Sequence, residues 1–460
     1  MRHRSSIIII FVAIVALIVL SLIDWNGVTH GKLKNFHLFG DLLPQEIVIT
    51  EGPADNIDPE LTKFVKEADT VKVDTAVTST PVVKEIPKNF VAPRIDGVVA
   101  LEDYSPSGDG FRRLAATFSE ASRRPVRVAM VGDSYIEGDI LAQDIRAGLQ
   151  DRYGGRGVGY IAAFNAFPGF RSSVNQAASG WHEHEIRKMN NDPLRTILGT
   201  YYTADAGADS RFRKSVKPAH VDCWDYTKVV FRADSSGTIT FSGPDFETKT
   251  FEVQASPNLQ CLTIDRPVGD IRFTTNVNGL NVLGFWLEGT KGIVLDDISL
   301  RGNSGVSHRV LNGPTTSQLR GFIDYDLIIL EFGMNALSAS QTNYSAYGSA
   351  MVDVVNNLRN LYPNAQFMIL GVGDRGQKIG TELGSMPTVT ALIRAQRDAA
   401  RRTGSLFWDT REAMGGDGAA VKWHERKLVN SDYVHLNHRG GRELAEIFLK
   451  SLDVTLKNNE

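Results

Sequence analysis

The stretch Val126–Asp139, VRVAMVGDSYIEGD, decides the fold and contains the first candidate functional residue. Its apolar run from Val126 to Val131 predicts a buried strand. The spacing of apolar residues over Ile140–Tyr153 predicts that a helix follows. The tripeptide Gly-Asp-Ser between them places the hydroxyl of Ser134 at the strand end, close to backbone N–H groups that a helix leaves unpaired. A nucleophile is useful at such a position.

The same alternation of strand and helix returns near the C-terminus. Its strands are continuous apolar runs of the kind that a parallel sheet buries on both faces. This alternation predicts an α/β fold with a doubly wound, mostly parallel sheet, in which sites lie at the carboxyl ends of the strands. The predicted order is strand Asp326–Phe332, helix Tyr344–Leu361, strand Phe367–Val372, a helix beginning at Pro387, strand Ser405–Asp409 and helix Gly441–Leu452.

A segment with a different residue pattern lies between the two α/β parts. Short runs of alternating apolar and polar residues, separated by Ser-Gly, Asn-Gly and Pro turns, fill residues 171–299. They predict an all-β sandwich of the jelly-roll type, inserted between α/β parts at 97–170 and 300–454. Trp181, Trp224 and Trp286 belong either to its core or to a surface that stacks on sugar rings.

The N-terminus is basic and is followed by the apolar run Ile7–Ile23, which is long enough to span a bilayer. A cleaved signal peptide is the alternative, but no Ala-x-Ala site follows the run. We therefore expect an uncleaved signal anchor over residues 1–24, with everything after Asp24 on the outer side of the membrane. Residues 25–96 are expected to form a juxtamembrane tether.

Composition excludes several classes of function. A formal net charge of −3 over 460 residues gives no reason to expect a nucleic-acid partner. The 2 cysteines, Cys223 and Cys261, form no C-x-x-C pair, so a thiolate zinc or redox site is not expected. Whether they pair in a disulfide stays open at this point.

Three further motifs lie just beyond predicted strands: residues 299–305 (SLRGNSG), residues 333–336 (GMNA) and residues 432–435 (DYVH). Together with Gly-Asp-Ser, the later glycine, the Gly-x-Asn and the Asp-x-x-His resemble the pattern of the SGNH (GDSL-type) hydrolases. The β insertion resembles, more narrowly, that of the periplasmic peptidoglycan O-acetylesterases. The resemblance implies a flavodoxin-like sheet and a serine esterase. It departs from the family at Ala336, where an Asp is usual.

The chemistry of these residues agrees with the resemblance. Serine is a weak nucleophile and needs a base within hydrogen-bond reach, for which His435 is the candidate. Asp432, three residues earlier, can reach the other ring nitrogen and fix the tautomer. The resemblance implies an oxyanion hole formed by the N–H groups of Ser134 and Gly305 and the side-chain amide of Asn335, with Gly302 as the alternative to Gly305.

We therefore expect a membrane-anchored serine esterase on the periplasmic side of a bacterial envelope. It would remove O-acetyl groups from a cell-envelope glycan, with peptidoglycan as the expected substrate, through an acyl-enzyme on Ser134. No metal and no organic cofactor are expected. The alternatives are an O-acetyltransferase acting on a polysaccharide, a lipase or thioesterase of the same fold, and a non-catalytic glycan-binding scaffold.

Overall fold

The structure is a computed structural model that describes residues 57–70 and 98–457. The predicted signal anchor and most of the predicted tether lie outside these residues. Within the described part of the chain, no helix is both long and apolar enough to cross a membrane.

The centre of the α/β part is a sheet with the strand order β1-β17-β14-β13-β2-β12. Five of these strands are parallel, and the short β1 pairs antiparallel with β17. Counted in chain order, the five parallel strands have the spatial order 2-1-3-4-5, so the carboxyl ends of β2 and β13 meet at the switch point where such sheets bind ligands. The strands are β1 Glu102–Asp103, β2 Pro125–Gly132, β12 Gly292–Ser299, β13 Leu327–Glu331, β14 Gln366–Leu370 and β17 Leu406–Trp408.

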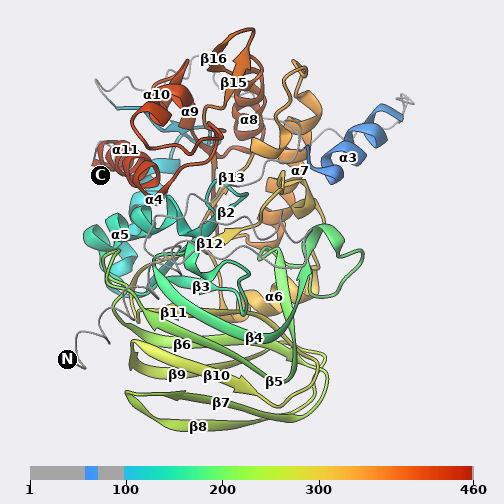
Figure 1. Cartoon of the computed structure of the whole chain (residues 1–460), viewed down its shortest axis with the longest axis vertical. Helices are drawn as coiled ribbons and strands as arrows, with labels where there is room; N and C mark the ends of the chain where they lie inside the picture. The colour runs from blue at the N-terminus through green and yellow to red at the C-terminus, as the bar shows by residue number, and fades with distance from the viewer. Residues whose placement is uncertain (1–56, 71–97, 458–460) are drawn as a thin grey trace, which may run out of the picture. The chain divides into compact units, whose positions relative to one another are not determined.

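Helices cover both faces of this sheet, as a doubly wound fold requires. Helices α4, α5 and α11 lie on one side, and α7 and α8 lie on the other (Figure 1). The predicted parallel strands and helices are confirmed, with boundaries that shift by a few residues. The helices are α3 Pro59–Thr70, α4 Gly110–Ser119, α5 Ala142–Tyr153, α6 Gly313–Phe322, α7 Ser345–Leu361, α8 Val389–Thr403, α9 Thr410–Met414, α10 Ala419–Glu425 and α11 His438–Lys457.

The inserted part is a large antiparallel sheet with its own apolar core. Strand β5 is long, and along one edge it pairs with β11 near its start and with β10 near its end. The rings of Phe212 and Phe273 both lie against Phe285, at centroid distances of 4.9 and 5.1 Å, so the two wings of the sheet share one core. The strands are β3 Gly159–Ile161, β4 Val174–Glu185, β5 Thr200–Lys214, β6 Trp224–Ala233, β7 Gly237–Gly243, β8 Phe246–Val253, β9 Gln260–Val268, β10 Asp270–Thr275 and β11 Leu280–Glu288; a separate hairpin comprises β15 Gly376–Ile379 and β16 Glu382–Ser385.

The boundaries of the insertion differ from the predicted 171–299. Strand β3 pairs with β11 and belongs to the antiparallel sheet, whereas β12 pairs in parallel with β2 and belongs to the α/β sheet. Two adjacent aspartates made β12 look like a half-exposed strand, but both are buried. Asp296 accepts hydrogen bonds from Trp286 and Tyr325, and Asp297 accepts one from the Asp139 N–H. These partners lie outside the strand, so the residue pattern of the strand alone could not show that both carboxylates are buried.

Two other expectations are corrected. The helix after Ser134 begins at Ala142 rather than Ile140, because Asp139 and Leu141 adopt positive φ angles of 66° and 69° in the preceding turn. The predicted tether contains α3, whose Leu61 is buried against the α/β core. Trp224 and Trp286 are fully buried, which leaves them to the core.

Candidate active site

Ser134, His435 and Asp432 form a continuous chain of hydrogen-bonding atoms beyond the carboxyl end of β2. Ser134 Oγ lies 2.9 Å from His435 Nε2, and His435 Nδ1 lies 2.7 Å from Asp432 Oδ2. The side chains of His435 and Asp432 are 18% and 8% exposed, and Ser134 is half-buried. The serine end of this chain is therefore accessible to a substrate, while the carboxylate end is nearly enclosed.

The turn that carries Asp432 and His435 is built by local hydrogen bonds. Asp432 Oδ1 accepts from the N–H groups of Val434 and His435, and Tyr433 has a φ of 56°. Burial raises the pKa of the Asp432 carboxyl, but the hydrogen bond to His435, the His435 charge and the two backbone donors outweigh it, so the pKa is lowered overall. The carboxylate is thus held ionised next to the imidazole.

Asp133, beside the nucleophile, has a different set of partners. It is fully buried and accepts hydrogen bonds from the Tyr135 N–H at 2.9 Å and from Asn335 Nδ2 at 3.0 Å. Burial raises the pKa of Asp133 to about 6, against the lowering effects of these donors and of His435. Its carboxylate therefore fixes the turn and Asn335, while Asp432 is the carboxylate that contacts the imidazole.

The three expected oxyanion donors differ in whether they already have hydrogen-bond partners. Within the described residues the Ser134 N–H has no hydrogen-bond partner. The Gly305 N–H donates to Asn303 Oδ1 at 2.9 Å, and Asn335 Nδ2 also donates to Asn303 O at 3.3 Å. The alternative, Gly302, has its carbonyl bound by Arg187. An oxyanion would have to compete with the contacts of the Gly305 N–H and of Asn335 Nδ2, and the roles of the donors stay predictions.

The sequence did not identify Asp58, which contacts both the segment before Gly305 and the segment of Asn335. Its N–H donates to Asn335 O at 3.0 Å, and its carboxylate accepts from Ser304 N at 2.9 Å and Ser304 Oγ at 2.7 Å. Asp58 also accepts from the Glu60 N–H at the start of α3. The dipeptide Asp58-Pro59 at the start of α3 is a recognisable signal for a helix N-terminus, although it says nothing of the distant contacts.

Two other histidines near the motifs have partners of their own. His308 is 2% exposed, and burial lowers its pKa to about 4. His438 lies at the start of α11 with its Nδ1 3.2 Å from Gln143 Nε2. In the structure, His435 is the histidine in contact with Ser134.

The fold and the grouping of these polar residues at its switch point define an α/β architecture with a doubly wound parallel sheet and an inserted antiparallel β-domain. A scan against known protein families finds no match, and no curated protein matches by sequence. Among solved structures, the chain is similar to one of a peptidoglycan O-acetylesterase, at 20% identity and a TM-score of 0.64. The match covers 78% of this chain and 99% of that one.

Other solved structures match more weakly. They include a family two carbohydrate esterase from Cellvibrio japonicus, at 10% identity and a TM-score of 0.26, covering 61% of this chain and 98% of that one. A putative GDSL-like lipase from Parabacteroides merdae matches at 16% identity and a TM-score of 0.27, covering 35% and 73%. At these values no argument rests on them. The resemblance inferred from the motifs is confirmed as a likeness of fold, on the first structure.

Proposed function

We propose that the protein is a serine ester hydrolase that removes O-acetyl groups from a cell-envelope glycan, with peptidoglycan as the substrate. The observation that carries this proposal is the hydrogen-bonded series Ser134–His435–Asp432 with an accessible serine. A binding scaffold has no use for a base held 2.9 Å from a serine hydroxyl and a buried carboxylate behind it. The fold likeness to a peptidoglycan O-acetylesterase supports the choice of substrate.

The proposed reaction uses these three residues in turn. Ser134 Oγ attacks the acetyl carbonyl carbon while His435 Nε2 takes its proton, and Asp432 stabilises the imidazolium that forms. The tetrahedral intermediate collapses when His435 returns the proton to the sugar oxygen, which leaves as an alcohol. Water then attacks the acyl-enzyme with His435 as base, and acetate leaves as Ser134 is regenerated.

The first test measures acetate release from O-acetylated peptidoglycan, from other acetylated polysaccharides and from acyl esters of increasing length. We expect Ser134→Ala to lower kcat by about 10⁶-fold, because the nucleophile is lost. Ser119→Ala, at an exposed serine of α4, is the matched control and should retain activity. Full turnover by the Ser134→Ala variant would contradict the mechanism.

The same assay separates the alternatives. A preference for long acyl chains over acetylated glycan would contradict the substrate and indicate a lipase or thioesterase. Transfer of labelled acetyl to an added acceptor glycan in place of release to water would indicate an O-acetyltransferase.

The proposed location is the outer side of a membrane, with the segment Ile7–Ile23 as an anchor. Its support is the length of the apolar run and the basic residues before it. Membrane fractionation of the full chain tests this location, because an anchored chain resists extraction by carbonate whereas a cleaved one does not.

A further inference from the structure

The loop between β3 and β4 presents an exposed aromatic residue beside the nucleophile. Phe167 keeps 58% of its surface exposed, although Phe is a residue type that folding normally buries. The guanidinium of Arg301 lies 5.3 Å from the centre of its ring, and Arg301 is bound in turn by Glu137, at 2.9 and 3.1 Å. Glu137 is the third residue after Ser134, so this aromatic ring belongs to the surroundings of the active site.

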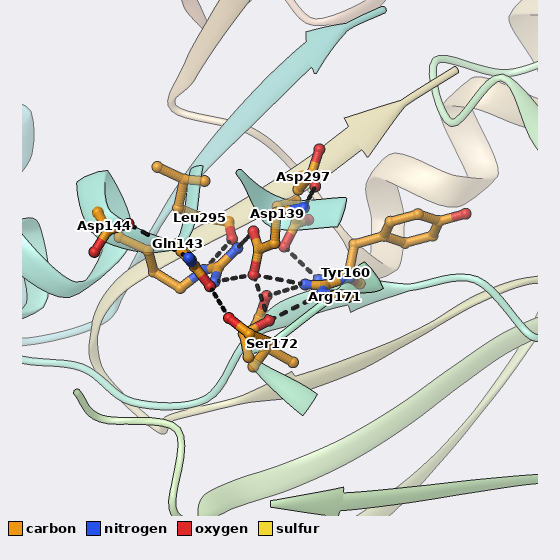
Figure 2. A network of polar contacts seen from close by, with 12 residues as sticks. Asp139, Gln143, Asp144, Tyr160, Arg171, Ser172, Leu295 and Asp297 are labelled. Atoms are coloured by element: carbon orange, nitrogen blue, oxygen red, sulfur yellow. Dashed lines mark hydrogen bonds and ion pairs between the residues drawn. The ribbon is translucent and has the colours of Figure 1, made fainter. Parts of the chain in front are cut away.

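The loop is fixed on both sides of Phe167. At its start, β3 is hydrogen-bonded to β11. At its end, Arg171 forms an ion pair with Asp139 at 3.3 Å, and Ser172 Oγ donates to Gln143 Oε1 at 2.7 Å (Figure 2). The ring of Phe170 lies so close to Gly138 that a methyl group there would be 2.4 Å from it. Phe167 is therefore displayed on a loop that is anchored to the segment carrying Ser134.

From these contacts we infer that Phe167 is a stacking platform for a pyranose ring of the acetylated glycan. Arg301 lies against the ring and its charge is balanced by Glu137, so it fixes the aromatic side chain without attracting anions. A sugar ring presents C–H groups that pack on an aromatic face. Because the loop that carries Phe167 is already held in place, little conformational entropy is lost when the sugar binds. This inference rests on the proposed function and specifies how the glycan is recognised.

The test compares Phe167→Ala with the wild type on O-acetylated glycan and on p-nitrophenyl acetate, which has no sugar ring. We expect kcat/KM on the glycan to fall about two- to tenfold relative to kcat/KM on the small ester, mainly through KM, as loss of one aromatic contact predicts. Phe167→Trp should restore glycan binding. Val216→Ala, at a residue that is 82% exposed on the inserted part, is the control and should leave the ratio unchanged.

If Phe167→Ala left the ratio of kcat/KM on glycan to kcat/KM on p-nitrophenyl acetate unchanged, the assignment of Phe167 as a stacking platform would be overturned. An equal fall of kcat/KM on both substrates would have the same consequence. These outcomes are distinct from failure of the proposed function, which Ser134→Ala reports on its own.

A second and independent observation concerns Asp58. This residue is 1% exposed and comes from the segment before the α/β sheet. Its carboxylate contacts Ser304, which follows β12, and its backbone N–H contacts Asn335, which follows β13. One of these contacts is to the backbone of Asn335 and the other is to Ser304, the residue before Gly305. We propose that Asp58 is a positioning residue that holds both oxyanion segments in register.

The test measures kcat and KM of Asp58→Ala on p-nitrophenyl acetate. Misplaced oxyanion donors act on the transition state, so we expect kcat to fall about tenfold or more while KM stays within about twofold. Asp58→Asn, which keeps an acceptor oxygen, should lie between. Leu61→Ala loosens the same helix through its buried side chain and is the control for stability. An equal fall of kcat in Leu61→Ala, or no fall in Asp58→Ala, would overturn the assignment.

Discussion

Two carboxylates serve the segment that carries Ser134, and they differ in the cation that holds each one. Asp432 contacts His435, whose ring can gain or lose a proton, and the chain of contacts ends at an accessible serine. Asp139 binds Arg146 through two hydrogen bonds of 2.7 and 2.6 Å, and both side chains are at most 1% exposed. Arginine stays protonated at any relevant pH.

This difference in partners predicts a catalytic role for Asp432 and a structural role for Asp139. Burial raises the pKa of both carboxyls, but His435 outweighs it at Asp432 and the two arginines outweigh it at Asp139, so both pKa values are lowered. Only the first carboxylate is coupled to a group that can move a proton. The second, with Arg171 and Asp297 around it, ties the nucleophile segment to α5, β12 and the loop before β4 (Figure 2). Substitutions at the two sites should therefore have different consequences.

Of the two carboxylates, Asp432 is expected to give the larger effect, and Asp432→Asn should act on activity. The amide would direct an N–H group at His435 Nδ1, and the imidazole would then carry its proton on Nε2, where it cannot accept the proton of Ser134. We expect kcat for acetate release to fall about 10⁴-fold, with little change in the thermal midpoint. If Asp432→Asn lost stability but kept its kcat, Asp432 would have a structural role like that of Asp139.

Asp139→Asn is expected to act on stability instead. Asparagine tolerates the positive φ of this position, so the backbone is not the cause. Removing the charge leaves Arg146 buried without its counter-ion, which costs about 3–5 kcal/mol in the free energy of unfolding. Since the pKa of Asp139 is lowered in the folded state, this stabilisation is complete above the usual carboxyl range and is lost as the pH falls below it.

The matched control is Asp270→Asn, which removes a carboxylate from a similar two-bond pair with Arg211 on the surface. Solvent screens exposed pairs of this kind, so we expect only a small loss of stability. Urea unfolding of both variants measures the difference. Equal losses of stability would show that burial does not distinguish the two pairs.

The parts that the sequence predicted correctly are those that depend on local pattern. Strands such as β13 are continuous apolar runs, and their type follows from the run itself. Ser134, His435 and Asp432 lie in contact, as the order of the motifs and the chemistry of the three residue types predict. None of this required knowledge of distant partners.

The parts that it missed depend on contacts that the local residue pattern does not encode. The identity of β12 was hidden because Asp296 is buried by Trp286 and Tyr325. The contacts of Asp58 were missed because its partners, Ser304 and Asn335, lie roughly 250 to 280 positions later in the sequence. The availability of the Gly305 N–H depends on where the side chain of Asn303 points, because Asn303 Oδ1 accepts from it, so motif spacing alone could not assign the oxyanion donors.

The smallest expected effect concerns Asp297, which shares the buried network with Asp139. Its Oδ2 accepts the Asp139 N–H, whereas its buried Oδ1 has no partner among the described residues. Burial and the charge of Asp139 raise the pKa of Asp297 to about 7. The folded state therefore holds a proton on Asp297 that the unfolded chain releases above about pH 4, and stability falls as the pH rises from there toward 7.

Asp297→Asn removes this titration while it keeps an oxygen for the Asp139 N–H. We expect the variant to lose less stability than the wild type between pH 5 and pH 8, where each unit of pKa shift corresponds to about 1.4 kcal/mol. Thermal unfolding at both pH values measures the difference, with Asp270→Asn as the control for the loss of one negative charge. A parallel decline in Asp297→Asn and the wild type would show that Asp297 is already ionised in the fold, and that both carboxylates of the network depend on the arginines alone.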